Sequence, residues 1–393
     1  MSRRGAAASL GVCALIVAGA ILVALLTGGG GHSTRIVVSD SGCGFDWVAP
    51  HSGRTVFTVQ NTTPKTIYSV ALVGADQSSI YGQIEALAPS TEVPLDVVLP
   101  PGEYSFLCQT KSGYTLVSPS REVTGPPVAD AHPYKPVDPQ QIDFAMLDYR
   151  ASLLPVLRRL VADTDRLATA VHAGKLAEAR TLWLPAHLDY AKLGVAYDTF
   201  GPFNDLINGR PLGLAGGVHD PKFQGFLRLE YGLWHGQAAA TLDPVAERLD
   251  ASVHGLLKQF PKLAIPSGDL TLRAHEILEN TLQFEFTGET DEGSNTNLAT
   301  AWSNVKGTGL ALTALHSVLN NANPELLAST TAQLGRLGRM LESYKRPDGR
   351  WVPLQSLTID QRERLDGALS GLLEQLDLIP DQLQPAPTGG NDD

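Results

Sequence analysis

Residues 223–236 read FQGFLRLEYGLWHG, a stretch whose spacing is that of a helix with one acidic side chain on an apolar face. Leu227 and Glu230 are three residues apart, so they lie on the same face of the expected helix. A carboxylate on such a face must have a partner if it is buried, and a cation such as Arg273 could be that partner.

Outward from this stretch, residues 141–379 have a helical pattern with marked starts. Four pairs place a capping side chain before a proline at the first helical position: Asp138-Pro139, Asp220-Pro221, Asp243-Pro244 and Asn323-Pro324. Residues 358–361, TIDQ, match a capping box at the start of the last helix. The sequence therefore predicts an all-α domain of about seven or eight helices. Asp220 is explained as a cap, whereas the adjacent His219 is free to be a surface residue or a ligand.

Composition limits the function classes. The chain has 393 residues, 43% hydrophobic and 18% charged, as expected for a folded protein of at least two domains. The net charge of −11 and the pI near 5.4 speak against a nucleic-acid-binding protein and are compatible with cation binding. No nucleophile motif, phosphate loop or His-Glu-x-x-His motif is visible, so an enzyme is not indicated.

The amino terminus predicts a membrane anchor. Residues 6–27 form an uncharged apolar run that is long enough to cross a bilayer, and Arg3 and Arg4 precede it. The arginines should stay in the cytoplasm and place the chain after Gly28 outside. A cleaved signal peptide is the alternative, but its small-residue pattern at residues 18–20 sits inside the apolar run, so we favour an uncleaved anchor. Cys13 is then a packed apolar residue.

Between the anchor and the helices, residues 34–125 alternate short apolar stretches with Gly, Pro, Asn and Ser clusters. The expected strands are residues 35–39, 55–60, 68–73, 93–99 and 104–108. Strands at this spacing indicate a small antiparallel β-sandwich. Residues 126–140 are rich in proline and predict a semi-rigid linker, residues 1–33 hold the anchor and a spacer, and residues 380–393 should be a disordered tail.

Three separated segments of the helical part resemble the imelysin/EfeO family. The family motif His-x-x-Glu corresponds to residues 227–230, with Leu227 in place of the histidine. Residues 187–201 resemble a Tyr-Glu helix that ends in Phe-Gly, although Ala191 and Gly194 replace its common glutamates. Residues 276–289 resemble a Glu-x-x-Glu helix followed by a Thr-Gly-Glu turn. The resemblance implies two helical bundles side by side, and a cupredoxin-like domain for the predicted sandwich.

The resemblance also implies a metal site in the helical domain. Ferric iron is a hard cation that prefers carboxylate or phenolate oxygens. Glu276 and Glu279 could present two carboxylates from one helix face, with Glu230 from a neighbouring helix and with His219 and Asp220 as further candidates. The alternative is that a pair of glutamates three apart is a solvated helix face.

Cys43 and Cys108 occupy positions where the cupredoxin-like domains of these proteins carry cysteines. A disulfide is favoured outside the cytoplasm, and a thiolate metal site is the alternative. Copper is unlikely, because a copper site would need histidine and often methionine nearby. No methionine occurs between residues 33 and 125, and His51 is the sole histidine there.

By this resemblance, the chain is expected to be an extracytoplasmic iron-binding component of an elemental iron uptake system, with an altered metal motif. Its implied partners are an iron permease and a haem peroxidase, its implied cargo is iron, and the anchor would attach it to the cytoplasmic membrane. Two alternatives remain. One is a scaffold or adaptor of the cell envelope that binds no metal, and the other is a metallopeptidase, for which the loss of the motif histidine is unfavourable.

Overall fold

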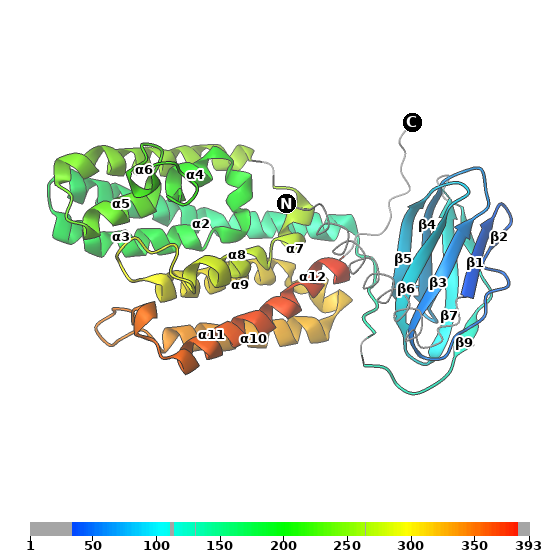
Figure 1. Ribbon diagram of the computed structural model, residues 1–393. Coiled ribbons are helices and arrows are strands. Elements are labelled where there is room, and N and C mark those ends of the chain that lie inside the picture. The colour runs from blue at the N-terminus through cyan, green and yellow to red at the C-terminus, as the bar shows by residue number, and fades with distance from the viewer. Residues whose placement is uncertain (1–33, 111–113, 130, 264, 384–393) are drawn as a thin grey trace, which may run out of the picture. The chain divides into compact units, whose positions relative to one another are not determined.

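The computed structural model describes residues 34–110, 114–129, 131–263 and 265–383, which fall into two compact units. The first unit extends to Pro136 and consists of strands, and the second begins at Val137 and consists of helices (Figure 1). The expected anchor at residues 6–27, Cys13 and most of the expected tail lie outside the described residues. In the part of the chain that is described, no helix has the length and hydropathy needed to span a membrane.

The first unit is a two-sheet β-sandwich. Its strands are β1 Thr34–Ser39, β2 Gly42–Cys43, β3 Gly53–Asn61, β4 Ile67–Gly74, β5 Ile80–Leu87, β6 Glu92–Leu99, β7 Gly102–Thr110, β8 Thr115–Val117 and β9 Arg121–Val123. One sheet has the order β2-β1-β3-β6, the other has the order β5-β4-β7-β8, and β9 pairs with β7. The prediction of an antiparallel sandwich is wrong for one pairing, because β1 runs parallel to β3. A parallel pair needs a crossover rather than a tight turn, and here β2 and residues 44–52 provide it.

Alternation along the strands builds the sandwich core. In β3, Thr55, Phe57 and Val59 are buried and alternate with more exposed neighbours, as expected where one face of a strand packs inward. Phe57 packs edge to face against Phe106 with ring centroids 5.3 Å apart. Cys43 and Cys108 form a disulfide inside this core, with Cα atoms 5.8 Å apart.

The proline-rich segment keeps contact with the sandwich near its end. Tyr134 exchanges both backbone hydrogen bonds with Ile80, and Lys135 forms an ion pair with Asp76 at 3.2 Å. The helical fold begins with Val137, which is buried, and with Pro139 at the start of the first helix.

The second unit is helical, as the sequence predicts. Its α-helices are α2 Pro139–His172, α3 Leu176–Ala191, α4 Pro202–Asn208, α5 Gly225–Trp234, α6 Ala239–Gln259, α7 Ser267–Leu272, α8 Glu276–Asn280, α9 Asn297–Ala322, α10 Pro324–Glu342, α11 Ile359–Leu376 and α12 Leu378–Gln382. A π-helical turn, Thr281–Glu285, continues α8. Seven of these described α-helices have ten or more residues, and the others are short segments around them. Helix α12 reaches beyond the boundary expected at residue 379, because Ile379 and Leu383 are buried in the helical core.

Local capping signals succeed at three of five predicted helix starts. Asp138 accepts a hydrogen bond from Gln140 N, Asn323 accepts one from Leu326 N, and Thr358 forms a complete capping box with Gln361. These interactions satisfy amide groups that have no partner within the helix.

The starts expected at Asp220-Pro221 and Asp243-Pro244 are wrong. Asp220 accepts hydrogen bonds from Gly216 N and Lys222 N, so it closes a turn five residues before α5 begins. Pro244 lies within α6, and Asp243 lies 3.2 Å from the ring of His172. An Asp-Pro pair serves a turn or the interior of a helix as well as a helix start, so the dipeptide alone does not decide.

The long helices form two groups. Helices α3 and α6 pack against α2, and α4 and α5 pack against α6. Helix α10 packs between α9 and α11, and α9 contacts both α2 and α3. Figure 1 shows α3–α6 on one side of the unit and α8–α12 on the other. Polar side chains of both groups meet at the candidate site described below.

Candidate functional site

Helix α5 is held in place by contacts at its first residues. Gly225 has φ of +81°, and a Cβ atom there would lie 2.2 Å from the carbonyl oxygen of Ile207, so only glycine fits this close approach. Trp183 Nε1 donates a hydrogen bond of 3.0 Å to the carbonyl of Phe226. These contacts turn one face of α5 inward, and both Leu227 and Glu230 are fully buried on it.

Glu230 is a buried carboxyl group with an incomplete set of partners. Its Oε1 accepts a hydrogen bond of 2.9 Å from Ser294 N, whereas its Oε2 has no hydrogen-bond partner among the described residues. Burial, followed by the negative charge of Asp291, raises its pKa well above the usual value for glutamate. Arg273, the arginine considered as its partner, forms ion pairs with Asp269 at 3.2 Å and with Glu276 at 3.4 Å. Glu230 therefore fixes a loop through a backbone amide.

That loop, residues 288–296, is organised by a second carboxylate. Asp291 accepts hydrogen bonds from the backbone N–H groups of Gly293, Asn295 and Thr296. Its charge also raises the pKa of Glu230. The loop thus brings two acidic groups together just before α9.

Glu285 adds a third acidic group from the π-helical turn. It accepts hydrogen bonds from Thr290 Oγ1 at 2.7 Å and from Asn297 Nδ2 at 3.1 Å. Burial raises the pKa of Glu285 to about 7, although these hydrogen bonds oppose the shift. Near neutral pH, Glu285 is therefore partly protonated and partly ionised.

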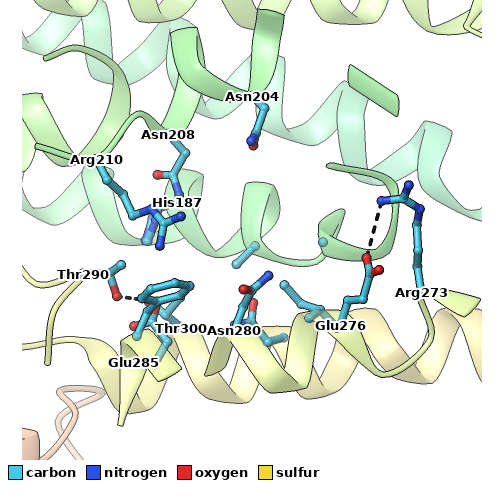
Figure 2. Close-up of a pocket in the computed structure, with 15 residues that line it drawn as sticks. His187, Asn204, Asn208, Arg210, Arg273, Glu276, Asn280, Glu285, Thr290 and Thr300 are labelled. Atoms are coloured by element: carbon cyan, nitrogen blue, oxygen red, sulfur yellow. Dashed lines mark hydrogen bonds and ion pairs between the residues drawn. The ribbon is translucent and has the colours of Figure 1, made fainter. Parts of the chain in front are cut away.

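Beside Glu285 lies a polar cavity of about 290 Å³ between the two helix groups. Asn204, Asn208 and Arg210 project into it from the α4 side, and Asn280, Glu285 and Thr300 lie opposite them (Figure 2). Glu276 also lines the cavity, where it is paired with Arg273 (Figure 2). The cavity is therefore rich in hydrogen-bond donors and acceptors and contains both positive and negative charges.

His187 closes one wall of this cavity. It is stacked on Trp183 with ring centroids 4.7 Å apart and is 4% exposed. Burial lowers the pKa of His187 to about 4, so its ring is neutral at physiological pH. Its Nδ1 atom and the Oδ1 atom of Asn208 are both buried and have no hydrogen-bond partner among the described residues.

Glu279 points to a different set of neighbours from Glu276. His275 Nε2 lies 3.8 Å from Glu279 Oε2 and 3.7 Å from Asp377 Oδ1. These three ligand atoms lie within 4.8 Å of one another, and none of the other four predicted ligands belongs to this group. His275 was missed in the sequence, although its i,i+4 spacing to Glu279 is visible there. Asp377 comes from the end of α11 and carries no local signal.

The contacts of His219 and Asp220 among the described residues do not include either glutamate of α8. The exposed ring of His219 approaches the edge of Tyr231, with centroids 6.2 Å apart. The hydrogen bonds from the Lys222 and Gly216 amides lower the pKa of Asp220, which accounts for both of its carboxylate oxygens. Asp220 thus has a structural role in its turn.

One more group of possible ligands occurs among the described residues. Asp165 on α2 and Asp250 and His254 on α6 bring their ligand atoms within 4.8 Å of one another. His254 Nε2 lies 2.9 Å from Asp165 Oδ1, and this hydrogen bond raises the pKa of His254. The contact is therefore explained as an interhelical ion pair.

A family model and several named proteins match this chain. Residues 145–379 match the family model described as imelysin. The chain is 28% identical over 344 residues to proteins named iron uptake system component EfeO from Escherichia coli K12, Shigella flexneri and Shigella sonnei, which covers 87% of this chain and 89% of each relative. This similarity is longer than the helical unit, so it extends into the sandwich. Because the family model spans more than half of the chain, this protein belongs to the imelysin family.

Proposed function

We propose that this chain is an extracytoplasmic, membrane-anchored component of a bacterial iron uptake system and acts as a binding protein rather than an enzyme. The observation that carries the proposal is the similarity to EfeO along nearly the whole chain, through both units. The net charge of −11 agrees with a cation as cargo. Residues 6–27 would provide the anchor.

Iron permease and haem peroxidase components are the proposed partners, and the sandwich is proposed as a cupredoxin-like domain without copper. Its two cysteines, Cys43 and Cys108, are joined in a disulfide. Neither sulfur is then a thiolate, which is the form that binds copper. The sandwich would contribute a rigid surface, and the helical unit would carry the iron.

Within the helical unit, we place the iron cargo at His275, Glu279 and Asp377. The set combines one imidazole nitrogen with two carboxylates, which suits iron in either common oxidation state. A metal with bonds near 2.1 Å holds its ligands roughly 3.0 to 3.4 Å apart. The separations of 3.7 and 3.8 Å from His275 Nε2 need only small side-chain rotations to reach that geometry.

The remaining predicted ligands take supporting roles in this proposal. Glu276 follows His275 directly, and its ion pair with Arg273 orients the start of α8. Glu230 lacks a nitrogen donor one turn before it because Leu227 occupies that position, and it supports the loop through Ser294. His219 and Asp220 belong to the turn before α5.

Metal titration of the full chain tests the site. We expect ferrous iron and zinc to bind with micromolar or tighter affinity by calorimetry under anaerobic conditions. His275→Ala and Asp377→Asn should each weaken binding at least tenfold, because each removes one of three ligands. His254→Ala is the matched control from the second His-Asp group and should bind like the wild type. Equal losses in His254→Ala and His275→Ala would refute the assignment.

A metal-free adaptor of the cell envelope is the second candidate function. Leu227 and Glu230 favour it, since both are buried and Glu230 is engaged by a loop amide. If the wild-type chain binds neither ferrous nor ferric iron at millimolar concentration, the adaptor becomes the better assignment.

A further inference from the structure

The cavity between the two helix groups contains more hydrogen-bond donors than its own acceptors use. Tyr190 Oη donates to Asn204 Oδ1 at 3.0 Å, which leaves both hydrogens of the Asn204 amide available to the cavity. The Arg210 guanidinium lies 4.0 Å from the centroid of the Phe284 ring, and its charge lowers the pKa of Glu285 in the same cavity. Stacking on an aromatic face leaves the edge of a guanidinium open to an anion.

The carboxylates of the cavity are poorly suited to hold a bare cation. Glu276 is ion-paired with Arg273. Glu285 is held by Thr290 and Asn297, and burial raises its pKa to about 7. Glu276 is thus neutralised by an arginine, and Glu285 is only partly ionised near neutral pH. A hard metal ion would therefore find few ligands in the cavity unless a further anion entered with it.

Two other wall positions supply no ligand atoms. Ala191 and Gly194 both line the cavity, and a Cβ atom at Gly194 would lie 2.2 Å from Ile277 Cδ1. The Ile277 side chain therefore leaves no room for a larger side chain at residue 194.

The same wall has buried polar atoms that need a ligand. His187 Nδ1 and Asn208 Oδ1 are both buried and have no hydrogen-bond partner among the described residues. Because a buried polar atom without a hydrogen-bond partner is unfavourable, a molecule that binds both atoms would be stabilised there. Asn208 Oδ1 requires a donor such as a hydroxyl group.

We propose that this cavity binds a small hydroxycarboxylate anion. Its carboxylate would lie against Arg210 and the Asn204 amide, and its hydroxyl group would donate to Asn208 Oδ1. A volume of about 290 Å³ suits a small acid and lies at the lower end of ligand pockets. A metal ion could enter the cavity only as the chelate of such an acid. This inference does not depend on metal binding at His275.

Calorimetry with iron-free citrate on the full chain is the first test, with ferric citrate and tricarballylate as comparison ligands. Citrate should bind, and tricarballylate, which lacks the hydroxyl group, should bind at least fivefold more weakly. Arg210→Gln should weaken citrate binding at least tenfold, since it removes the charged donor but retains a polar side chain. Arg364→Gln on exposed α11 is the matched control and should leave affinity unchanged. Circular dichroism would verify that both variants are folded.

The outcomes separate this inference from the iron site. If the chain binds ferric citrate but not free citrate, and Arg210→Gln weakens this binding, the cavity is a binding site and its ligand is the iron chelate. Loss of citrate binding in Arg210→Gln with retained ferrous iron binding shows that the two sites are distinct. No binding of either citrate form at millimolar concentration, or equal binding by wild type and Arg210→Gln, overturns the proposal.

Discussion

Replacement of Glu230 by glutamine should change how the stability of the helical unit depends on pH. Glutamine has nearly the same shape and keeps an oxygen that can accept the Ser294 N–H hydrogen bond. It carries no charge at any pH. The variant therefore removes only the ionisation of a fully buried carboxyl group whose pKa is raised by burial and by Asp291.

The direction follows from the raised pKa of Glu230. In the unfolded chain the group ionises near 4.5, whereas the folded protein holds the proton to a much higher pH. Its contribution to stability is complete below about pH 4.5 and is lost as the pH rises toward the folded-state pKa. Within that window the folding equilibrium falls about tenfold for each pH unit. Between pH 5 and pH 8, wild type should thus lose at least about 1 kcal/mol more than Glu230→Gln.

Urea unfolding followed by circular dichroism at the helical signal would measure the effect between pH 5 and pH 9. Glu285 also contributes a loss of stability as the pH rises, because burial raises its pKa to about 7. Since Glu285 is present in both proteins, the difference between wild type and Glu230→Gln reports Glu230. Glu247→Gln, at an exposed position of α6, is the control and should follow the wild-type curve. Parallel curves for wild type and Glu230→Gln would refute the reasoning, because they would mean that the carboxyl group is not held in its protonated form.

Three further changes test other parts of the structure. Leu227→His should lower the free energy of unfolding by roughly 2 to 4 kcal/mol, because it buries an imidazole in place of a leucine. If the new histidine and Glu230 can bind a cation, zinc should restore part of this loss in a thermal unfolding assay. No response to zinc would show that one substitution does not rebuild a metal site. Replacing Cys43 and Cys108 together by alanine should cost about 4 kcal/mol in the sandwich by urea unfolding, since the disulfide closes a loop with a sequence separation of 65; an unchanged midpoint would contradict this value. Gly194→Ala should lower the free energy of unfolding by about 1 to 3 kcal/mol, because its Cβ would lie 2.2 Å from Ile277 Cδ1. Adding Ile277→Ala to this variant should recover part of the loss. Equal stability of Gly194→Ala and wild type would mean that the Ile277 side chain moves aside at little cost.

The sequence predicts well what local interactions determine. The caps at Asp138, Asn323 and Thr358 succeed because each side chain binds an amide two or three residues away. The pairs at Asp220 and Asp243 fail because the same side chain satisfies a turn or a neighbouring helix equally well. Helix starts are thus predictable only where no other donor, in a local turn or on another helix, competes for the capping oxygen.

The partners in the candidate site depend on long-range contacts. The burial of Glu230 agrees with an acidic residue on an apolar helix face, but its partner is the amide of Ser294, 64 residues away in a loop folded by Asp291. Nothing near Glu230 in the sequence distinguishes this amide from an arginine side chain. The same holds for Asp377, which reaches His275 from the end of another helix.

The start of α8 links the two proposed binding sites. His275 and Glu276 are consecutive, yet His275 lies beside Glu279 and Asp377, whereas Glu276 lines the cavity with Arg273. The helix has only five residues before its π-helical turn, so its backbone has few regular hydrogen bonds of its own to resist rotation. A ligand that fixes His275 therefore also fixes the backbone that carries Glu276 and its ion pair. Occupation of either site should for this reason alter the affinity of the other, by equal factors in both directions.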